Sequence, residues 1–321
     1  MNRCWICCAP LPPDAARYHT ACTRKLFGTA QPPQLDYDWA DLNRLAEQVV
    51  RRSIAVPGVQ PKLSLHLERR RGAAGRLTIV GLAGHFILKP PVPDYPELPE
   101  NEHTVMRMAE LFGIRAAPCG LIALHSGERA YLTRRLDRVG GNKLHMEDMA
   151  QLTDKLTEQK YRGSMEQVGR ALLRWSAQPL LDAQFLFELT LYAFLTGNSD
   201  MHLKNFSLLH APDGRVTLAP AYDLVAVILA LPADREELAL TLNGKKRELK
   251  RRDFDAFATH LGLEPAQIAA SHARLARKLL AALDFVGQSF LSAPARAALC
   301  ALMRQRAARL GWVKSSRRPE A

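Results

Sequence analysis

Alternating hydrophobic and polar positions predict that the first part of the chain is rich in β-strands. Between residues 62 and 68, Leu63, Leu65 and Leu67 fall on one side of an extended chain, the pattern of a half-buried strand. Four more strands are expected at residues 76–80, 85–89, 120–124 and 129–133. Together with one helix, these strands would form a β-rich unit that spans residues 31–140.

The helix predicted in this unit carries an acidic residue on its hydrophobic side. It begins near Pro99 with acids in its first turn, where the positive end of the helix dipole favours them. Glu102 lies three residues before Val105 and therefore shares the stripe that faces the core. Because burial of an unpaired carboxylate is costly, Glu102 is expected to pair with a cation.

Residues 141–321 are mostly helical in pattern, and we expect them to form an all-helical unit that is larger than the first. Residues 180–196 are hydrophobic on nearly every side, which indicates a buried helix. Gly197 follows directly and is placed to end that helix.

A dense group of polar residues comes next. Asp200 and Asn205 are five positions apart, as in the catalytic loop of protein kinases, where a carboxylate orients the attacking hydroxyl and an amide oxygen holds Mg²⁺. His202 and Lys204 add hydrogen-bonding groups between them. Asp223 follows a hydrophobic segment and could supply a second metal-binding carboxylate. A polar loop that merely ends a helix is the alternative interpretation.

Two further segments offer groups for phosphate. Lys89 ends a hydrophobic strand thirteen residues before Glu102, and kinases use a strand lysine, held by a helix glutamate, on the α- and β-phosphates. A lysine that reaches to solvent is the alternative. Upstream, Gly58 would let backbone amides approach a phosphate, with Gln60 and Lys62 as additional donors. By itself this segment could equally be an ordinary turn.

The first 30 residues carry a possible zinc unit. Cys4 and Cys7 form one pair of ligands, and His19 and Cys22 form a second pair after eleven intervening residues. Two such pairs can close a tetrahedral Cys₃His site of the structural kind. Cys8 competes as a ligand, and a group of reduced cysteines without metal is the alternative.

The overall composition is that of a globular protein. The 321 residues are 47% hydrophobic and 24% charged, which argues against a disordered chain or a coiled coil as a description of the whole chain. The formal net charge of +12 favours an anionic partner such as a nucleotide, a nucleic acid or an acidic protein face. The sequence shows no signal peptide, no span hydrophobic enough for a membrane and no disulfide framework, so a reducing, cytoplasmic location is expected.

Taken together, the motifs resemble the HipA-type serine/threonine kinases, the toxins of bacterial toxin–antitoxin systems. The matching segments are 53–55, 58–62, 86–90, 100–103, 134–138, 145–148, 198–206 and 220–223. They occur in the order of the family. The resemblance implies an α+β, two-lobed protein-kinase-like fold with a β-rich N-lobe, a larger helical C-lobe and an active site between them.

The resemblance also implies residue roles. Asp200 would be the catalytic aspartate, Asn205 and Asp223 would hold Mg²⁺, Lys89 would contact the phosphates of ATP, and Ser53 would be autophosphorylated. The other residues expected at the nucleotide are Pro57, Gly58, Val59, Gln60, Pro61, Lys62, Glu102, Arg134, Arg135, Leu136, His202, Leu203, Lys204, Tyr222, Leu224 and Val225.

The family targets aminoacyl-tRNA synthetases, so arrest of translation is the expected effect. The chain is shorter than full-length HipA and resembles the HipT branch, in which a separate small protein supplies an N-terminal subdomain and acts as antitoxin. A DNA-binding antitoxin would complete such a system. Two alternatives stay open: a catalytically silent regulatory or nucleic-acid-binding module, and a small-molecule or lipid phosphotransferase.

Overall fold

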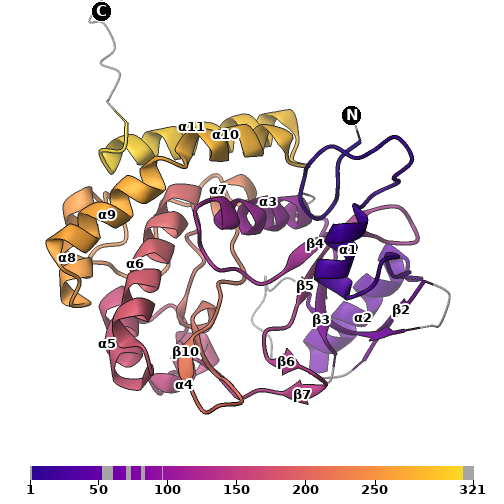
Figure 1. Ribbon diagram of the computed structural model, residues 1–321, viewed down its shortest axis with the longest axis horizontal. Coiled ribbons are helices and arrows are strands. Elements are labelled where there is room, and N and C mark those ends of the chain that lie inside the picture. The colour runs from indigo at the N-terminus through magenta and orange to yellow at the C-terminus, as the bar shows by residue number, and fades with distance from the viewer. Residues whose placement is uncertain (1, 53–60, 70–73, 81–83, 96, 314–321) are drawn as a thin grey trace, which may run out of the picture.

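A five-stranded antiparallel sheet forms one end of the molecule and a group of helices the other (Figure 1). This computed structural model describes residues 2–52, 61–69, 74–80, 84–95 and 97–313. The strand order in the sheet is β2-β1-β3-β5-β4. These strands are β1 (Leu63–Glu68), β2 (Arg76–Ile79), β3 (Phe86–Lys89), β4 (Cys119–Ala123) and β5 (Arg129–Arg134). All five predicted strands are present, with ends shifted by at most one residue.

The register of the sheet explains why its central strands are hydrophobic. Leu63 pairs with Leu88 across β1 and β3, and Lys89 at the end of β3 pairs with Tyr131 of β5. Leu63 and Leu65 are almost fully buried, as the alternating pattern predicts. The last residue of β3 is thereby fixed beside the buried interior.

The N-terminal segment packs into the same hydrophobic core as this sheet. Helices α1 (Thr20–Phe27) and α2 (Trp39–Arg52) flank the sheet. Cys4, Ile6 and Leu26 join one cluster with the leucines of β1 and β3. Gly120 of β4 permits this close approach, because a Cβ atom there would lie 2.8 Å from Ile6 Cγ1.

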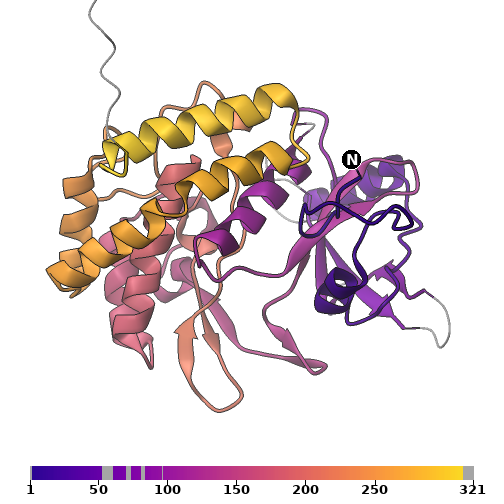
Figure 2. The ribbon, with the colours of Figure 1, turned by 45° about the horizontal axis from the view of Figure 1, so that its top comes forward.

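The helical lobe is built around a hydrophobic central helix. Helix α6 (Pro179–Thr196) is buried along most of its length and ends at Gly197, which has a left-handed φ of 78°. Helix α3 (Leu98–Leu111) lies between the sheet and the helices, and it contacts β4, β5 and α10. The other helices are α4 (Met149–Leu152), α5 (Met165–Trp175), α7 (Val227–Ala230), α8 (Arg251–His260), α9 (Pro265–Ala276), α10 (Leu279–Gln288) and α11 (Ala293–Arg309). Figure 2 shows α10 and α11 side by side.

The prediction of an all-helical second lobe is wrong. A three-stranded antiparallel sheet of order β10-β9-β8 lies within it, formed by β8 (Met146–Asp148), β9 (Ser207–His210) and β10 (Val216–Leu218). A short ribbon of β6 (Arg138–Val139) and β7 (Asn142–Lys143) precedes this sheet. Strands β9 and β10 are joined by a turn in which Gly214 has a φ of 84°. Strands of three or four residues are too short to show a clear alternation, so the surrounding helical pattern concealed them.

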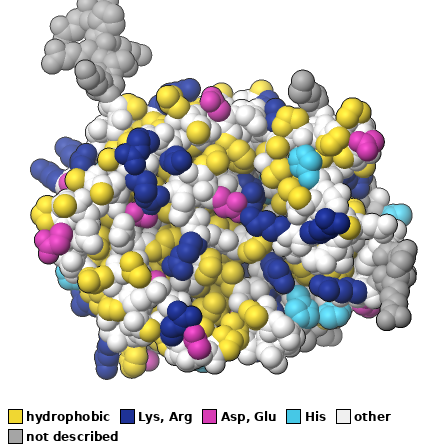
Figure 3. Space-filling model, viewed as in Figure 1, with side chains coloured by type: hydrophobic (Ala, Val, Ile, Leu, Met, Phe, Trp, Pro, Cys, Tyr) yellow, Lys and Arg dark blue, Asp and Glu magenta, His cyan; other side chains and the backbone are white. Residues whose placement is uncertain are grey.

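The surface is strongly basic. Figure 3 shows lysine and arginine side chains spread over one face of the molecule, with fewer acidic side chains among them. Within the described residues, no helix has both the length and the hydrophobicity needed to cross a bilayer.

Candidate active site

Lys89 lies at the centre of the charged groups between the two lobes. Its Nζ atom lies 2.6 and 2.8 Å from the two carboxylate oxygens of Glu102 and also contacts Oδ1 of Asp223. The side chains of Lys89 and Glu102 are only 5% and 4% exposed. Strand β3, helix α3 and the segment after β10 each contribute one member, and the ion pair predicted between Lys89 and Glu102 is present.

Burial and charge act in opposite directions on these groups. Burial alone would lower the pKa of Lys89, but the carboxylates of Asp223 and Glu102 outweigh it and hold the pKa above its usual value. Burial raises the pKa of Glu102 to about 7, although Lys89 opposes the shift. Burial also works against ionisation of Asp223, but Lys62 and Lys89 keep its pKa well below the usual range. Lys89 and Asp223 are therefore charged at neutral pH.

Asp223 contacts side chains from both lobes. Its Oδ2 lies 2.8 Å from Nζ of Lys62, the residue before β1, and 3.5 Å from Nδ2 of Asn205. Its backbone has a positive φ of 55°, a conformation that aspartate tolerates better than most residues. The segment that follows Asp223 is held by α3, because the side chain of Asn101 exchanges two hydrogen bonds of 2.9 Å with the backbone of Ala226.

The loop after α6 presents Asp200 to solvent. The hydroxyl of Tyr161 donates a hydrogen bond to Oδ1 of Asp200, and its ring packs edge-on against His202 at 5.0 Å between centroids. The backbone N–H of Leu203 donates to the carbonyl of Lys160, which ties the Tyr161 segment to this loop. Burial lowers the pKa of His202 to about 4, so its imidazole is neutral at physiological pH.

The sheet of β8, β9 and β10 holds the same loop in place. Lys204 Nζ lies 2.6 Å from Oδ2 of Asp148, the last residue of β8. The hydroxyl of Tyr222 lies 2.5 Å from that of Ser207 and donates to the carbonyl of Lys204 at 3.0 Å. These contacts hold the loop that carries Asn205 beside the segment that carries Asp223. The sequence offered no signal for the position of Tyr161, whereas Asp148 belonged to a matching motif without an assigned role.

Several residues predicted to contact the nucleotide either lie outside the described residues or are buried. Ser53, Pro57, Gly58, Val59 and Gln60 lie outside the described residues, and Pro61 is half-buried just before β1. Leu203 and Leu224 are completely buried, so only their backbone could face a ligand. Val225 is half-buried beside Leu224.

The predicted hinge residues connect the two lobes. Arg134 ends β5, and the backbone N–H of Arg135 donates to the carbonyl of His85 at 2.9 Å. The side chain of Arg135 binds Asp137 through two hydrogen bonds, of 2.9 and 2.8 Å. Leu136 packs against the core of the helical lobe.

The donor groups at Asp223 suit a hard divalent cation. Asn205 supplies an amide and Asp223 a carboxylate, and magnesium prefers oxygen ligands of these two kinds. The ion pairs from Lys62 and Lys89 show that Asp223 already serves as an acceptor for positive charge. The residue types of Asn205 and Asp223 fit the two magnesium ligands expected from the sequence, but the amide of Asn205 would have to turn. Its nitrogen faces Asp223, while its oxygen accepts the backbone N–H of His202 at 3.3 Å.

The four residues of the predicted zinc unit lie together near the N-terminus. One ligand atom from each of Cys4, Cys7, His19 and Cys22 falls within 4.8 Å of the others. Nδ1 of His19 is 3.4 Å from the sulfur of Cys7, and Nε2 lies 3.0 Å from the carbonyl of Pro10. If Nε2 carries the proton, that bond leaves Nδ1 as a ligand. The set fits a structural Zn²⁺ site, and the bond from Cys7 lowers the pKa of Cys4 to about 4.

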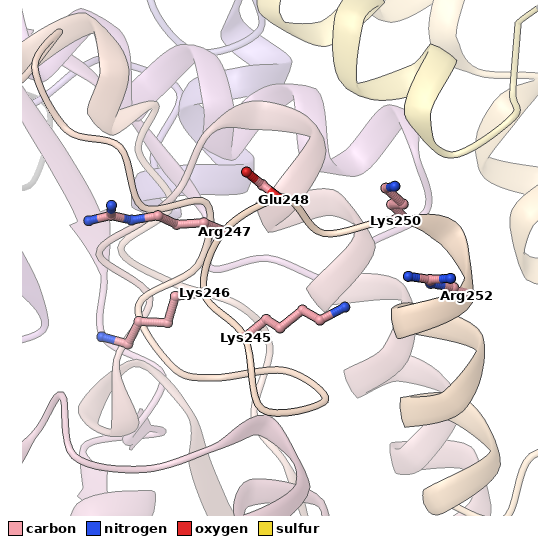
Figure 4. Close-up of a pocket in the computed structure, with 6 residues that line it drawn as sticks. All are labelled: Lys245, Lys246, Arg247, Glu248, Lys250 and Arg252. Atoms are coloured by element: carbon pink, nitrogen blue, oxygen red, sulfur yellow. The ribbon is translucent and has the colours of Figure 1, made fainter.

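A basic hollow lies on the helical lobe (Figure 4). Its lining consists of Lys245, Lys246, Arg247, Glu248, Lys250 and Arg252. Part of the charge is neutralised, because Lys245 pairs with Asp253 at 2.9 Å and Lys246 with Glu236 at 3.2 Å. The remaining charge suits an anionic partner, as the composition predicts.

The fold and the charged groups together define a class of protein. A β-rich lobe that supplies a buried Lys–Glu pair, joined to a helical lobe that supplies an Asp and an Asn, is the arrangement of protein kinases. The chain therefore has a protein-kinase-like fold.

The chain belongs to the HipA-like family. The family model of the HipA-like C-terminal domain matches residues 54–283. A Haemophilus influenzae protein named "Putative kinase" is 30% identical over 298 residues, which covers 82% of this chain and 84% of that protein. The predicted resemblance to the HipA-type kinases is confirmed at the level of the family.

Two comparisons involve HipA of Shewanella oneidensis. The serine/threonine-protein kinase toxin HipA is 27% identical over 250 residues, which covers 70% of this chain but only 55% of that protein. The solved structure of HipA with HipB and operator DNA superposes with a TM-score of 0.66 at 24% identity, covering 86% of this chain and 73% of that one. At that identity the structural likeness supports the fold alone.

Proposed function

We propose that this chain is an ATP- and Mg²⁺-dependent serine/threonine protein kinase and the toxin of a toxin–antitoxin system. The convergence of Lys89, Glu102 and Asp223 from three separate elements carries the proposal, because a kinase needs this triad at the phosphates. A buried lysine shared by two carboxylates has a desolvation cost that a purely structural role explains poorly. Membership of the HipA-like family and the kinase name of the Haemophilus relative support the same activity.

The residues divide the work of phosphoryl transfer. Lys89 and Lys62 offer positive charge to the phosphates of ATP, and Glu102 keeps Lys89 in position. Asn205 and Asp223 would hold Mg²⁺, which neutralises charge on the phosphates when bound. Asp200 orients the attacking hydroxyl and accepts its proton.

Tyr161 supports the role of Asp200, because its hydroxyl already donates a hydrogen bond to that carboxylate. A serine or threonine hydroxyl of a substrate would need the same acceptor. The neutral imidazole of His202 beside it can exchange hydrogen bonds without competing as a cation. Because a carboxylate accepts through two oxygens, Asp200 can receive a substrate hydroxyl at Oδ2 while Tyr161 stays bonded to Oδ1.

The nucleotide is proposed to lie between the lobes. The segment 57–62 would face its phosphates and residues 134–136 its adenine, while His202 to Lys204 and Tyr222 to Val225 would line the helical side. Two hydrogen bonds support this placement: the backbone N–H of Arg135 donates to the carbonyl of His85, just before β3, and the hydroxyl of Tyr222 donates to the carbonyl of Lys204.

The biological role follows the family resemblance. We include autophosphorylation of Ser53, an aminoacyl-tRNA synthetase as target, action in the cytoplasm and a place in the HipT-like branch. A small antitoxin and a DNA-binding antitoxin would be the companion proteins. The solved complex of Shewanella HipA with HipB and operator DNA supports a companion of the second kind.

The proposal is tested by intact-mass analysis after incubation with Mg²⁺ and ATP. Wild-type protein, Asp200→Ala and the exposed control Asp213→Ala are compared, with peptide mapping of any phosphate. Wild type and control are expected to gain one phosphate at Ser53, and Asp200→Ala none. Phosphate on a protein side chain also argues against a small-molecule or lipid phosphotransferase.

The competing function is a catalytically silent module that binds an anionic partner, which the net charge of +12 and the basic hollow favour. Folded wild-type protein that binds ATP but neither hydrolyses it nor transfers phosphate to itself or to an added synthetase would overturn the kinase proposal in favour of this module. Equal activity of Asp200→Ala and wild type would instead overturn only the assignment of Asp200.

A further inference from the structure

A second cluster of side chains that carry possible metal ligands lies at β8 and β9 in the helical lobe. It consists of His145, Glu147 and His210. His145 Nε2 lies 3.0 Å from Oε2 of Glu147, and His210 Nε2 lies 3.4 Å from the same oxygen. The two imidazole rings meet edge to face, with 4.5 Å between their centroids.

The geometry of the sheet produces this cluster. Met146 pairs with Leu209 across β8 and β9, and the backbone N–H of His210 donates to the carbonyl of His145 at 2.9 Å, so the two histidines stand opposite each other. Glu147 lies two residues after His145 and therefore projects from the same face of the strand. Three donor side chains thus share one face of an antiparallel strand pair.

We propose that His145, Glu147 and His210 form a binding site for a divalent transition-metal ion such as Zn²⁺. One ligand atom from each side chain lies within 4.8 Å of the other two, close enough to share one ion after small side-chain rotations. Two imidazoles and one carboxylate are a ligand set suited to zinc and its neighbours rather than to Mg²⁺ or Ca²⁺. The partial exposure of all three side chains leaves room for water to complete the coordination.

This site is independent of the cysteine cluster and of the kinase proposal. It uses no thiolate, whereas Cys4, Cys7 and Cys22 would bind metal through sulfur. It uses no residue assigned above to nucleotide or magnesium. Its occupancy would nevertheless stiffen β8, whose last residue, Asp148, holds Lys204 of the catalytic loop.

The test is equilibrium dialysis of the full chain against buffered Zn²⁺ at neutral pH, with bound metal counted by mass spectrometry. The double variant His145→Gln with His210→Gln is expected to bind one zinc fewer per chain than wild type. Glu147→Gln is expected to weaken this zinc by at least about 10-fold, the lower end of what loss of an outer-shell partner costs.

A matched control exists in the other sheet. His66 and His85 also lie side by side, with rings tilted by 51°, 5.1 Å between ring centroids and 3.2 Å between their Nδ1 atoms, but no carboxylate joins them in a ligand cluster among the described residues. The double variant His66→Gln with His85→Gln is expected to keep the zinc count of wild type.

Cobalt distinguishes the two proposed sites, because the cysteine cluster would give sulfur-to-cobalt absorption and the histidine site would not. Loss of cobalt from the His145/His210 variant without loss of that absorption supports the proposal. An unchanged metal count in that variant, with its fold intact by circular dichroism, would overturn it.

Discussion

Removal of the buried charge of Lys89 should destabilise the protein in a way that a second substitution repairs. In Lys89→Met, Glu102 and Asp223 lose their shared cation, while Asp223 keeps Lys62. Loss of one partner from a buried ion pair costs about 3–5 kcal/mol, because the other charge stays buried without compensation. Replacement of both partners by hydrophobic residues is often close to neutral, so Lys89→Met with Glu102→Leu should regain much of the loss.

The pH dependence provides an independent check on the same pair. Burial already raises the pKa of Glu102 to about 7, and loss of Lys89 would raise it further. A carboxyl whose pKa is raised by folding stabilises the folded state below its unfolded pKa, and this contribution is lost as the pH rises through the folded value. Between pH 5 and pH 7 Glu102 is protonated in both folded proteins, so wild type and Lys89→Met lose stability in parallel. The deficit of Lys89→Met should therefore grow only above about pH 7, by up to about 1.4 kcal/mol per pH unit, and the double variant should lack the slope that Glu102 causes.

Urea unfolding followed by circular dichroism measures both effects in one double-mutant cycle. Residues in contact are expected to couple by about 0.5–3 kcal/mol, and this pair should fall in the upper part of that range. The exposed pair Arg215–Asp213 serves as the control, and Arg215→Met with Asp213→Leu should leave the urea midpoint unchanged. If the single and double variants lose equal stability at every pH, the reasoning about Lys89 and Glu102 is refuted.

Three further outcomes follow from the structure. Burial lowers the pKa of His103 to about 3 and that of His202 to about 4. The free energy of unfolding should therefore fall as the pH drops below about 6.5, by about 1.4 kcal/mol per pH unit for each histidine. A His103→Asn variant that shows the wild-type slope in urea unfolding would contradict this. Asn101→Ala should cost about 1–3 kcal/mol for each backbone group of Ala226 left unpaired, and a loss below about 0.5 kcal/mol would mean that water replaces the amide. Cys22→Ser should retain less zinc than wild type through dialysis and melt at a lower temperature, whereas wild-type protein that holds no zinc at this cluster would rule out the metal.

Much of the fold could be anticipated from local pattern. The strands at 63–68 and 86–89 and the buried helix 179–196 appear where hydrophobic periodicity places them. The pairing of Lys89 with Glu102 followed from the cost of burying an unpaired carboxylate. Periodicity failed for β8, β9 and β10, because strands of three or four residues contain too few alternations to stand out from a helical background.

The candidate site divides in the same way. The spacing between Asp200 and Asn205 singled out both residues, and the order of the motifs along the chain linked them to Asp223. Spacing and motif order could not reveal that the hydroxyl of Tyr161 contacts Asp200. Nor could they reveal that Asn101 hydrogen-bonds to the backbone of Ala226, three residues after Asp223. These contacts join residues 39 and 125 positions apart in the chain, and no local pattern records such a distance.

The sequence by itself therefore determined the longer strands and the buried central helix, which charged residues need partners and which family the motifs resemble, since each depends on neighbours within a few positions. Tertiary structure alone decided the shared position of Lys62, Lys89 and Asp223 and the histidine cluster across β8 and β9. Both depend on strand register and on packing between lobes, and packing is set by the summed burial of many side chains rather than by any one segment.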